Sequence, residues 1–419
     1  MLKCFGDIGY EITESGELTR FSASGNTITI PSQLPGGEMV KSIGSSFYEG
    51  RCSTIIIDDN ITEINSCAFD RAAVDIVVWS LGCSYIPEFC FTESFVKNVK
   101  NIEHVTKIGR FAFSNSDIVD IKWPSKCEVI PEACFLNSWL ESITNISHVH
   151  TIEKDAFYGS KIDKLRWPSS CKAIPEGCFA RTQIKTISNI SHVTEIGGNA
   201  FMYSSLNRFK WPSNCRTIPV GCFSYSTLKG ITNIDNVSEI GEHAFDNSNI
   251  ANFRWPSACD VIPAYCFVDC SCLSAIENID HVKSVGVCAF LRSDIRQICW
   301  PSKCCEVPES CFYGSHLNFI ENIGHVTSIG PGAFCESHIK HIVWPSGCNV
   351  IPKSCFATSA LSEITNLSQV TVVETFAFKN LLFLQNIIDF STSAAVIDSM
   401  AFSGVPADKI ELPYYCEGV

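Results

Sequence analysis

The stretch WPSKCEVIPEACF, from Trp123 to Phe135, returns three more times at intervals of 44 residues. The copies read WPSSCKAIPEGCF from Trp167, WPSNCRTIPVGCF from Trp211 and WPSACDVIPAYCF from Trp255. Each copy carries two cysteines at the same spacing. Such a pattern could mark a metal site, a set of disulfides or a repeated hydrophobic core, and the rest of the chain has to decide between them.

Phenylalanine shows that the true period is half as long. Phenylalanines 22 residues apart run from Phe47 to Phe267, continue from Phe290 to Phe378 after a one-residue insertion, and end at Phe402. The chain therefore holds seventeen 22-residue units in two alternating versions, one with tryptophan and one with asparagine. The tryptophans of the first version are Trp79, Trp123, Trp167, Trp211, Trp255, Trp300 and Trp344. One such unit cannot bury its apolar side alone, so stacked units are expected to form a solenoid.

Each unit has the same predicted local structure. A short strand is indicated by segments such as LESITNI (140–146) and IVDIKWP (118–124). A bend follows, and then a compact segment such as IPEACF (130–135), whose proline followed by an acidic residue suits a short helix or a 3₁₀ turn. Stacked at the usual strand spacing of about 4.8 Å, the seventeen units would span roughly 80 Å.

The segment LESITNISHVHTIEKDAFYGS, from Leu140 to Ser160, resembles the BspA-type leucine-rich repeat. The resemblance extends from about Asn26 to Pro413. It implies a leucine-rich-repeat solenoid with a parallel β-sheet on its concave face and short helical or 3₁₀ turns on its convex face. It also implies a non-enzymatic, protein-binding repeat protein, of the kind that acts as a cell-surface adhesin or antigen. The alternative is an intracellular scaffold that assembles other proteins on the same face.

Three parts of the chain are expected. Residues 1–46 are predicted to form an N-terminal hairpin and an irregular first coil, and residues 47–413 form the repeat array. Residues 414–419 form a C-terminal end. It is either an irregular cap or the point at which a longer protein continues, because terminal repeats normally shield the core.

Composition narrows the classes of partner. The chain has 419 residues, a formal net charge of -13 and a pI near 5.3, which argues against a general nucleic-acid binder. No apolar run approaches the length of a membrane span, and the N-terminus lacks the apolar region of a signal peptide. The missing signal peptide predicts the cytoplasm, whereas the family resemblance predicts the cell surface, so localisation is left open.

The two cysteine columns are predicted to lie in the core. When the two versions of the unit are aligned, Cys127 falls on Val149 and Cys134 falls on Ala156. Free cysteine behaves as a small buried hydrophobe, so most of these thiols are expected to be free and protected. Disulfides between Cys127 and Cys134, and between their equivalents, remain an alternative, as does a metal.

Other candidate metal ligands have structural interpretations. One histidine column contains His104, His148, His192, His281 and His325, with Asn236 and Gln369 in the gaps. Its members are two coils apart, too far to share one ion, so a hydrogen-bonding role in a turn is predicted. A zinc site formed by Cys266, Cys270, Cys272 and Cys288 is weighed and set aside. No metal, no cofactor and no enzyme signature is predicted.

The outward positions of the strands carry a basic stripe. If Ile121 and Trp123 point inward, Lys122 points outward. The stripe consists of Lys100, Lys122, Lys164, Arg166, Arg208, Lys210 and Arg254. An acidic protein or an anionic glycan could dock on it. The alternative is a solvated face that prevents aggregation.

Tryptophan and asparagine are predicted to share one inward column, so that Trp123 lies between Asn101 and Asn145. The asparagines are then expected to bond the neighbouring indoles or the backbone of the bend, because buried polar groups need partners. The N-x-S/T sequons at Asn145, Asn189 and Asn366 lie in this column and are set aside as glycan acceptors on that ground.

Overall fold

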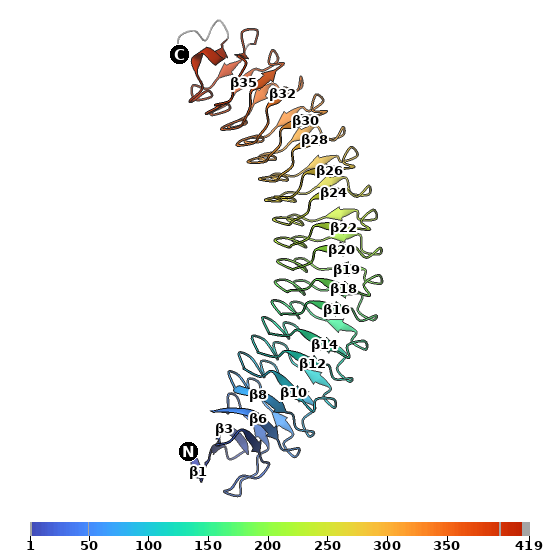
Figure 1. Cartoon of the computed structure of the whole chain (residues 1–419), viewed down its shortest axis with the longest axis vertical. Coiled ribbons are helices and arrows are strands. Elements are labelled where there is room, and N and C mark those ends of the chain that lie inside the picture. The colour runs from blue at the N-terminus through green and yellow to red at the C-terminus, as the bar shows by residue number, and fades with distance from the viewer. Residues whose placement is uncertain (1, 49, 394, 413–419) are drawn as a thin grey trace. The chain divides into compact units, whose positions relative to one another are not determined.

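The structure is a computed structural model that describes residues 2–48, 50–393 and 395–412 (Figure 1). Backbone contacts divide the chain into two units, residues 1–206 and 207–419, and each unit is a stack of coils. A typical coil contributes one three-residue strand and one two-residue strand, and each strand pairs in parallel with its equivalent in a neighbouring coil. The predicted solenoid of parallel strands is therefore confirmed. We call the row of longer strands the strand face.

The first unit begins with three antiparallel strands, β1 (Lys3–Phe5), β2 (Ile8–Ile12) and β3 (Glu17–Ser22). Its strand face consists of β4 (Thr27–Ile30), β6 (Arg51–Ile57), β8 (Ala73–Val78), β10 (Asn98–Lys100), β12 (Asp120–Lys122), β14 (Ser142–Thr144), β16 (Lys164–Arg166) and β18 (Thr186–Ser188). Its second row consists of β5 (Ser42–Ile43), β7 (Glu63–Ile64), β9 (Tyr85–Ile86), β11 (Lys107–Ile108), β13 (Val129–Ile130), β15 (Thr151–Ile152), β17 (Ala173–Ile174) and β19 (Glu195–Ile196).

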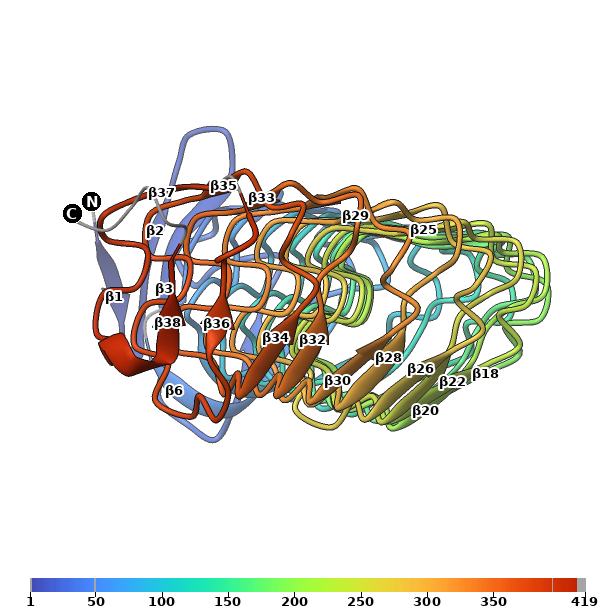
Figure 2. The same ribbon diagram turned by 90° about the horizontal axis from the view of Figure 1, so that it is seen from above.

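The second unit repeats this arrangement. Its strand face consists of β20 (Arg208–Lys210), β22 (Gly230–Thr232), β24 (Asn252–Arg254), β26 (Ala275–Glu277), β28 (Gln297–Cys299), β30 (Phe319–Glu321), β32 (His341–Val343), β34 (Glu363–Thr365), β36 (Ile388–Asp389) and β38 (Ile410–Glu411). Its second row consists of β21 (Thr217–Ile218), β23 (Glu239–Ile240), β25 (Val261–Ile262), β27 (Ser284–Val285), β29 (Glu306–Val307), β31 (Ser328–Ile329), β33 (Val350–Ile351), β35 (Val372–Val373) and β37 (Val396–Ile397). Figure 2 shows the two rows on different sides of these coils.

The C-terminal end is described only in part. Strand β38 pairs in parallel with β36, so the last described residues begin a further coil beyond the seventeen phenylalanine units. Residues 414–419, for which an irregular cap or a continuing chain is expected, lie outside the described residues. The boundaries drawn from the sequence at residues 46 and 413 stay predictions.

Stacked phenylalanines form the centre of the core. The ring of Phe135 lies 5.4 Å from that of Phe113 and 5.8 Å from that of Phe157, with the planes almost parallel. The Trp123 indole packs edge-on against Phe135 at 6.0 Å and is fully buried. Large aromatic side chains dominate the burial of apolar area, so this ladder is the main stabilising feature of each coil. The one tryptophan outside the 44-residue grid, Trp139, is exposed.

The segment after the second-row strand forms hydrogen-bonded turns rather than a helix. The Ser138 N–H donates to the Phe135 carbonyl at 3.1 Å within the coil, as in a 3₁₀ turn. The Phe135 N–H instead donates to the Ala156 carbonyl of the next coil at 2.9 Å, and Ala133 has a positive φ of 50°. A backbone N–H that donates to the next coil cannot also form the hydrogen bond to the fourth preceding carbonyl that an α-helix requires. In the described part of the chain, only Ala407–Lys409 forms a 3₁₀ helix, and no α-helix occurs.

Candidate functional site: the strand face

Side chains alternate along each strand as the sequence predicts. In β12 the Ile121 side chain is buried, whereas Asp120 and Lys122 are exposed. All seven side chains of the predicted basic stripe are exposed: Lys100, Lys122, Lys164 and Arg166 in the first unit, and Arg208, Lys210 and Arg254 in the second. Among the residues that the structure describes, none of the seven forms an ion pair or a hydrogen bond through its side chain. Their role in binding stays a prediction.

Small neighbours leave three of these cations in water, whereas Arg254 lies opposite Glu277. Lys122 lies opposite Thr144 in the paired strand, and Arg166 lies opposite Ser188. In the second unit Lys210 likewise lies opposite Thr232. A threonine or serine neither neutralises nor covers a long basic side chain, so the charged head remains available to a partner.

The asparagine column determines where strands pair. The Trp123 N–H donates to the Thr144 carbonyl in the next coil at 3.0 Å, which extends the β12–β14 pairing by one residue. Asn145 has a positive φ of 61°, a conformation that asparagine tolerates better than most residues. The chain therefore turns directly after Thr144, and β14 is not paired with β16 in the described sheets. From β8 to β34, the described strands of the strand face thus pair from a tryptophan coil to the following asparagine coil and then stop.

The predicted inward asparagine column is wrong. Asn145 is exposed and Asn189 is partly exposed, while Ile146, the next residue, is buried and takes the inward position. The reason is the turn at Asn145, which rotates the side chain outward. Burial therefore does not rule out the sequons in this column. However, the Asn145 Nδ2 donates to the Trp123 carbonyl at 2.8 Å, so a glycan there would have to displace this bond.

The indole finds its acceptor in its own coil. The Trp123 Nε1 donates to the Cys127 carbonyl at 2.9 Å, and the His148 Nε2 of the next coil lies 3.0 Å from the Pro124 carbonyl and 3.2 Å from that of Cys127. The predicted role of the histidine column in the turn is confirmed. The asparagines bond the backbone of the neighbouring tryptophan, as one of the two predicted options requires, and not its indole.

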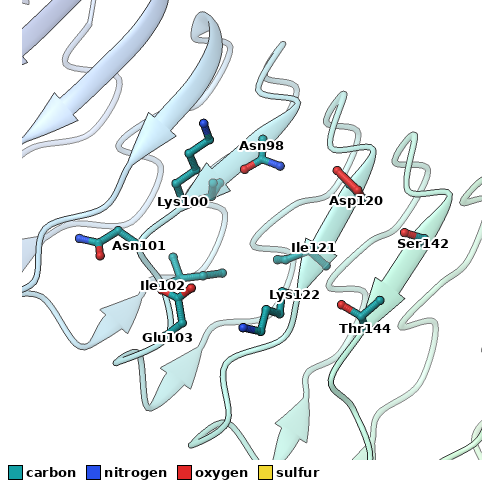
Figure 3. Close-up of a pocket in the computed structure, with 11 residues that line it drawn as sticks. Asn98, Lys100, Asn101, Ile102, Glu103, Asp120, Ile121, Lys122, Ser142 and Thr144 are labelled. Carbon is teal, nitrogen blue, oxygen red and sulfur yellow. The ribbon is translucent and has the colours of Figure 1, made fainter.

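A hollow opens on the strand face where pairing stops. It lies between β10 and β12, has a volume of about 440 Å³, and is lined by Lys100, Lys122, Glu103, Asp120 and other residues of three successive coils. Figure 3 shows Lys100 on β10 and Lys122 on β12 at this hollow, with Asp120 on the same strand as Lys122 and Ser142 on the next strand, β14. Two cations without partners lie here beside two carboxylates, Glu103 and Asp120, so the lining of this hollow is mixed in charge rather than uniformly basic.

The cysteine columns are core positions. Cys134 is fully buried and Cys127 nearly so, and the Cys127 Sγ donates to the Val105 carbonyl at 3.4 Å. Burial raises the pKa of Cys127 to about 12 and that of Cys134 well above its usual value. Such thiols are poor nucleophiles and poor metal ligands, because the thiolate is the reactive form.

The cysteines weighed as a zinc site have different surroundings. Cys266 and Cys270 are fully buried, whereas Cys272 is exposed. Among the described residues, no group of three or more histidine, cysteine or acidic side chains is arranged to hold a metal ion. Cys299 is exposed on the strand face, at the last position of β28.

Within residues 2–48, 50–393 and 395–412, no helix has the length and apolar character needed to span a membrane.

A family model described as a BspA type leucine-rich repeat region matches residues 21–141, 106–229, 194–318 and 283–411. A leucine-rich repeat protein from Bacteroides ovatus has a similar solved structure, with 19% identity, 92% of this chain and 93% of that chain covered, and a TM-score of 0.50. The structure of a leucine-rich cell surface protein from Faecalibacterium prausnitzii is 20% identical, covers 88% of this chain and 96% of its own, and has a TM-score of 0.41. The structure of the pneumococcal vaccine antigen PcpA is 14% identical, covers 95% of this chain and 98% of its own, and has a TM-score of 0.40. No curated protein matches the chain.

Proposed function

The chain belongs to the BspA-type leucine-rich repeat family, and we propose that it is a non-enzymatic binding protein whose strand face holds an anionic partner. The family is a repeat family that typically lacks catalysis. The proposed partner is an acidic protein or an anionic glycan, and the proposed setting is a cell surface, where the chain acts as an adhesin or antigen.

The observation that carries this proposal is the row of exposed cations without partners. The protein is acidic overall, with a formal net charge of -13, yet Lys122 and Arg166 project from neighbouring tryptophan coils into solvent. Several other basic side chains form ion pairs, as Arg71 does with Glu93 at 2.8 Å. Local positive charge of this kind attracts anionic partners and speeds their association.

A matched pair of charge-reversal variants tests the proposal. Lys122→Glu/Arg166→Glu alters the strand face, and Lys126→Glu/Lys172→Glu makes the same change in net charge on the same two coils, outside the strands. Immobilised heparin and immobilised polyglutamate serve as the glycan and polypeptide probes. The strand-face variant is expected to elute from at least one probe at lower salt than the control. Equal elution of both variants from both probes would remove the strand face as the site.

An intracellular scaffold is the second candidate. Its support is the set of exposed free thiols, Cys4, Cys272, Cys299 and Cys305, which a reducing compartment would keep reduced. Antibody staining of intact and permeabilised cells separates the two settings. An adhesin is stained on intact cells, whereas a scaffold is stained only after permeabilisation.

A further inference from the structure

A second hollow on the strand face is lined by apolar and acidic side chains, in place of the mixed cations and carboxylates of the first. It lies between β30 and β32 in the second unit, has a volume of about 580 Å³, and is lined by Phe319, Glu321, Val343, Glu363 and neighbouring residues. We propose that this hollow docks a basic peptide segment that carries an apolar side chain. This partner differs in chemistry from the anionic partner proposed above, and the inference does not depend on that proposal.

The backbone forms this hollow in the same way as the first. Asn322 has a positive φ of 56°, and its Nδ2 donates to the Trp300 carbonyl at 2.8 Å. β28 pairs with β30 and β32 pairs with β34, but β30 and β32 are not paired in the described sheets. The gap between the two pairs is therefore built into the repeat.

This hollow is larger than the first, at about 580 Å³ against about 440 Å³. Gly324 occupies the repeat position that Glu103 occupies in the hollow between β10 and β12. No other atom lies within 4 Å of the place where a Cβ would be on Gly324. Because this position lacks a side chain, the hollow can admit one from a partner.

Two large apolar side chains flank the opening. Phe319 is 47% exposed and Val343 is 63% exposed. In the first hollow the equivalent positions hold Asn98 and Lys122. A single exposed apolar residue is ordinary, but one on each side of the same hollow makes an apolar site that is poorly hydrated. A partner's apolar side chain would remove both from water.

Acidic groups determine the charge of the partner. The Glu321 carboxylate is exposed and has no ion pair or hydrogen bond within the described residues. Glu363 accepts a hydrogen bond from the Asn386 Nδ2 at 2.8 Å and lies 3.2 Å from the His341 Nδ1, which holds this carboxylate at the edge of the hollow. A lysine or arginine of the partner would therefore complement Glu321, while an anionic partner would be repelled.

Three labelled synthetic peptides test the inference on the full chain: alternating lysine and leucine, alternating lysine and serine, and alternating glutamate and leucine. The lysine–leucine peptide is expected to bind most tightly and to protect amides of 319–324 and 341–343 from hydrogen exchange. Phe319→Ser and Glu321→Lys are each expected to weaken it about tenfold, as the loss of a central contact does. Glu239→Lys, an exposed glutamate of the second row in the same unit, is the matched control and should change little.

Three outcomes would overturn the inference. The first is a failure of the lysine–leucine peptide to bind. The second is equal weakening by Glu321→Lys and Glu239→Lys, which would show attraction to the acidic chain in general. The third is concentration-dependent self-association in sedimentation velocity that Phe319→Ser abolishes, which would make the hollow an interface between copies of the chain. None of these three outcomes affects the elution of the chain from heparin or polyglutamate, so the proposed function is tested separately.

Discussion

A tryptophan coil and the asparagine coil that follows it share one 22-residue frame but end their strands differently. In the first, Trp123 stays extended, buries its indole and donates its N–H to the next coil. In the second, Asn145 turns the chain through a positive φ and remains exposed. The difference shows how a regular solenoid acquires hollows, because within each unit alternation groups the strands into pairs and leaves unpaired junctions after asparagines.

The two hollows extend this comparison from backbone to side chains. Both lie at a junction after an asparagine, yet one is flanked by Lys100 and Lys122 and the other by Glu321 and Val343 at the equivalent positions. The 22-residue repeat therefore creates the hollows. The exposed strand positions, which contribute little to the core, determine the charge and polarity of each hollow.

The largest expected effect is on the tryptophan coil. Trp167→Ala should lower the free energy of unfolding by about 3–5 kcal/mol, because it leaves a cavity beside Phe179 in a fully buried position. Chemical denaturation measures this value. Trp139→Ala, at the exposed tryptophan, is the control and should change stability little. A Trp167→Ala protein as stable as the parent would mean that the tryptophans face solvent.

The asparagine coil should respond less. Asn145→Leu is expected to cost on the order of 1–3 kcal/mol, since it removes the hydrogen bond to the Trp123 carbonyl and places a bulky residue at positive φ. Asn145→Gly keeps the backbone conformation and loses only the amide, so its cost should be smaller. Equal costs for leucine and glycine would show that the positive φ contributes nothing.

Thiol reactivity checks the core shared by both coils. Burial raises the pKa of Cys127 to about 12, so at neutral pH the folded chain has less of the reactive thiolate than the unfolded chain. Alkylation followed by mass measurement should modify Cys299 and the other exposed thiols first, and the buried columns only in guanidinium. Disulfides between Cys127 and Cys134 and between their equivalents, found in the chain purified without reductant, would contradict this prediction.

The smallest effect on stability is expected at the strand face. Glu321→Lys/Val343→Lys gives the second hollow the cations of the first and should change the free energy of unfolding by less than about 0.5 kcal/mol, because both side chains are exposed. The variant should need more salt for elution from heparin than the parent. Unchanged elution would mean that these two positions do not control the charge of the site.

Much of this architecture could be predicted from the sequence. The spacing of Phe113, Phe135 and Phe157 determines the coil length, and the match between Cys134 and Ala156 identifies a core column. The alternation of Ile121 and Lys122 determines which strand positions face solvent, because side chains in a strand alternate with a period of two. These features depend on local periodicity, which a sequence records directly.

Only the tertiary structure decided the conformation of Asn145 and its consequences. Alignment places Asn145 on Trp123, but a backbone that turns at one residue moves the inward position to Ile146. Where a short helix or a 3₁₀ turn is expected, hydrogen bonds between coils likewise select separate turns, as the bond from Phe135 to Ala156 does. Residue spacing contains no record of φ or of which neighbour a backbone donor serves, so the unpaired junctions and their hollows follow only from the stacked coils.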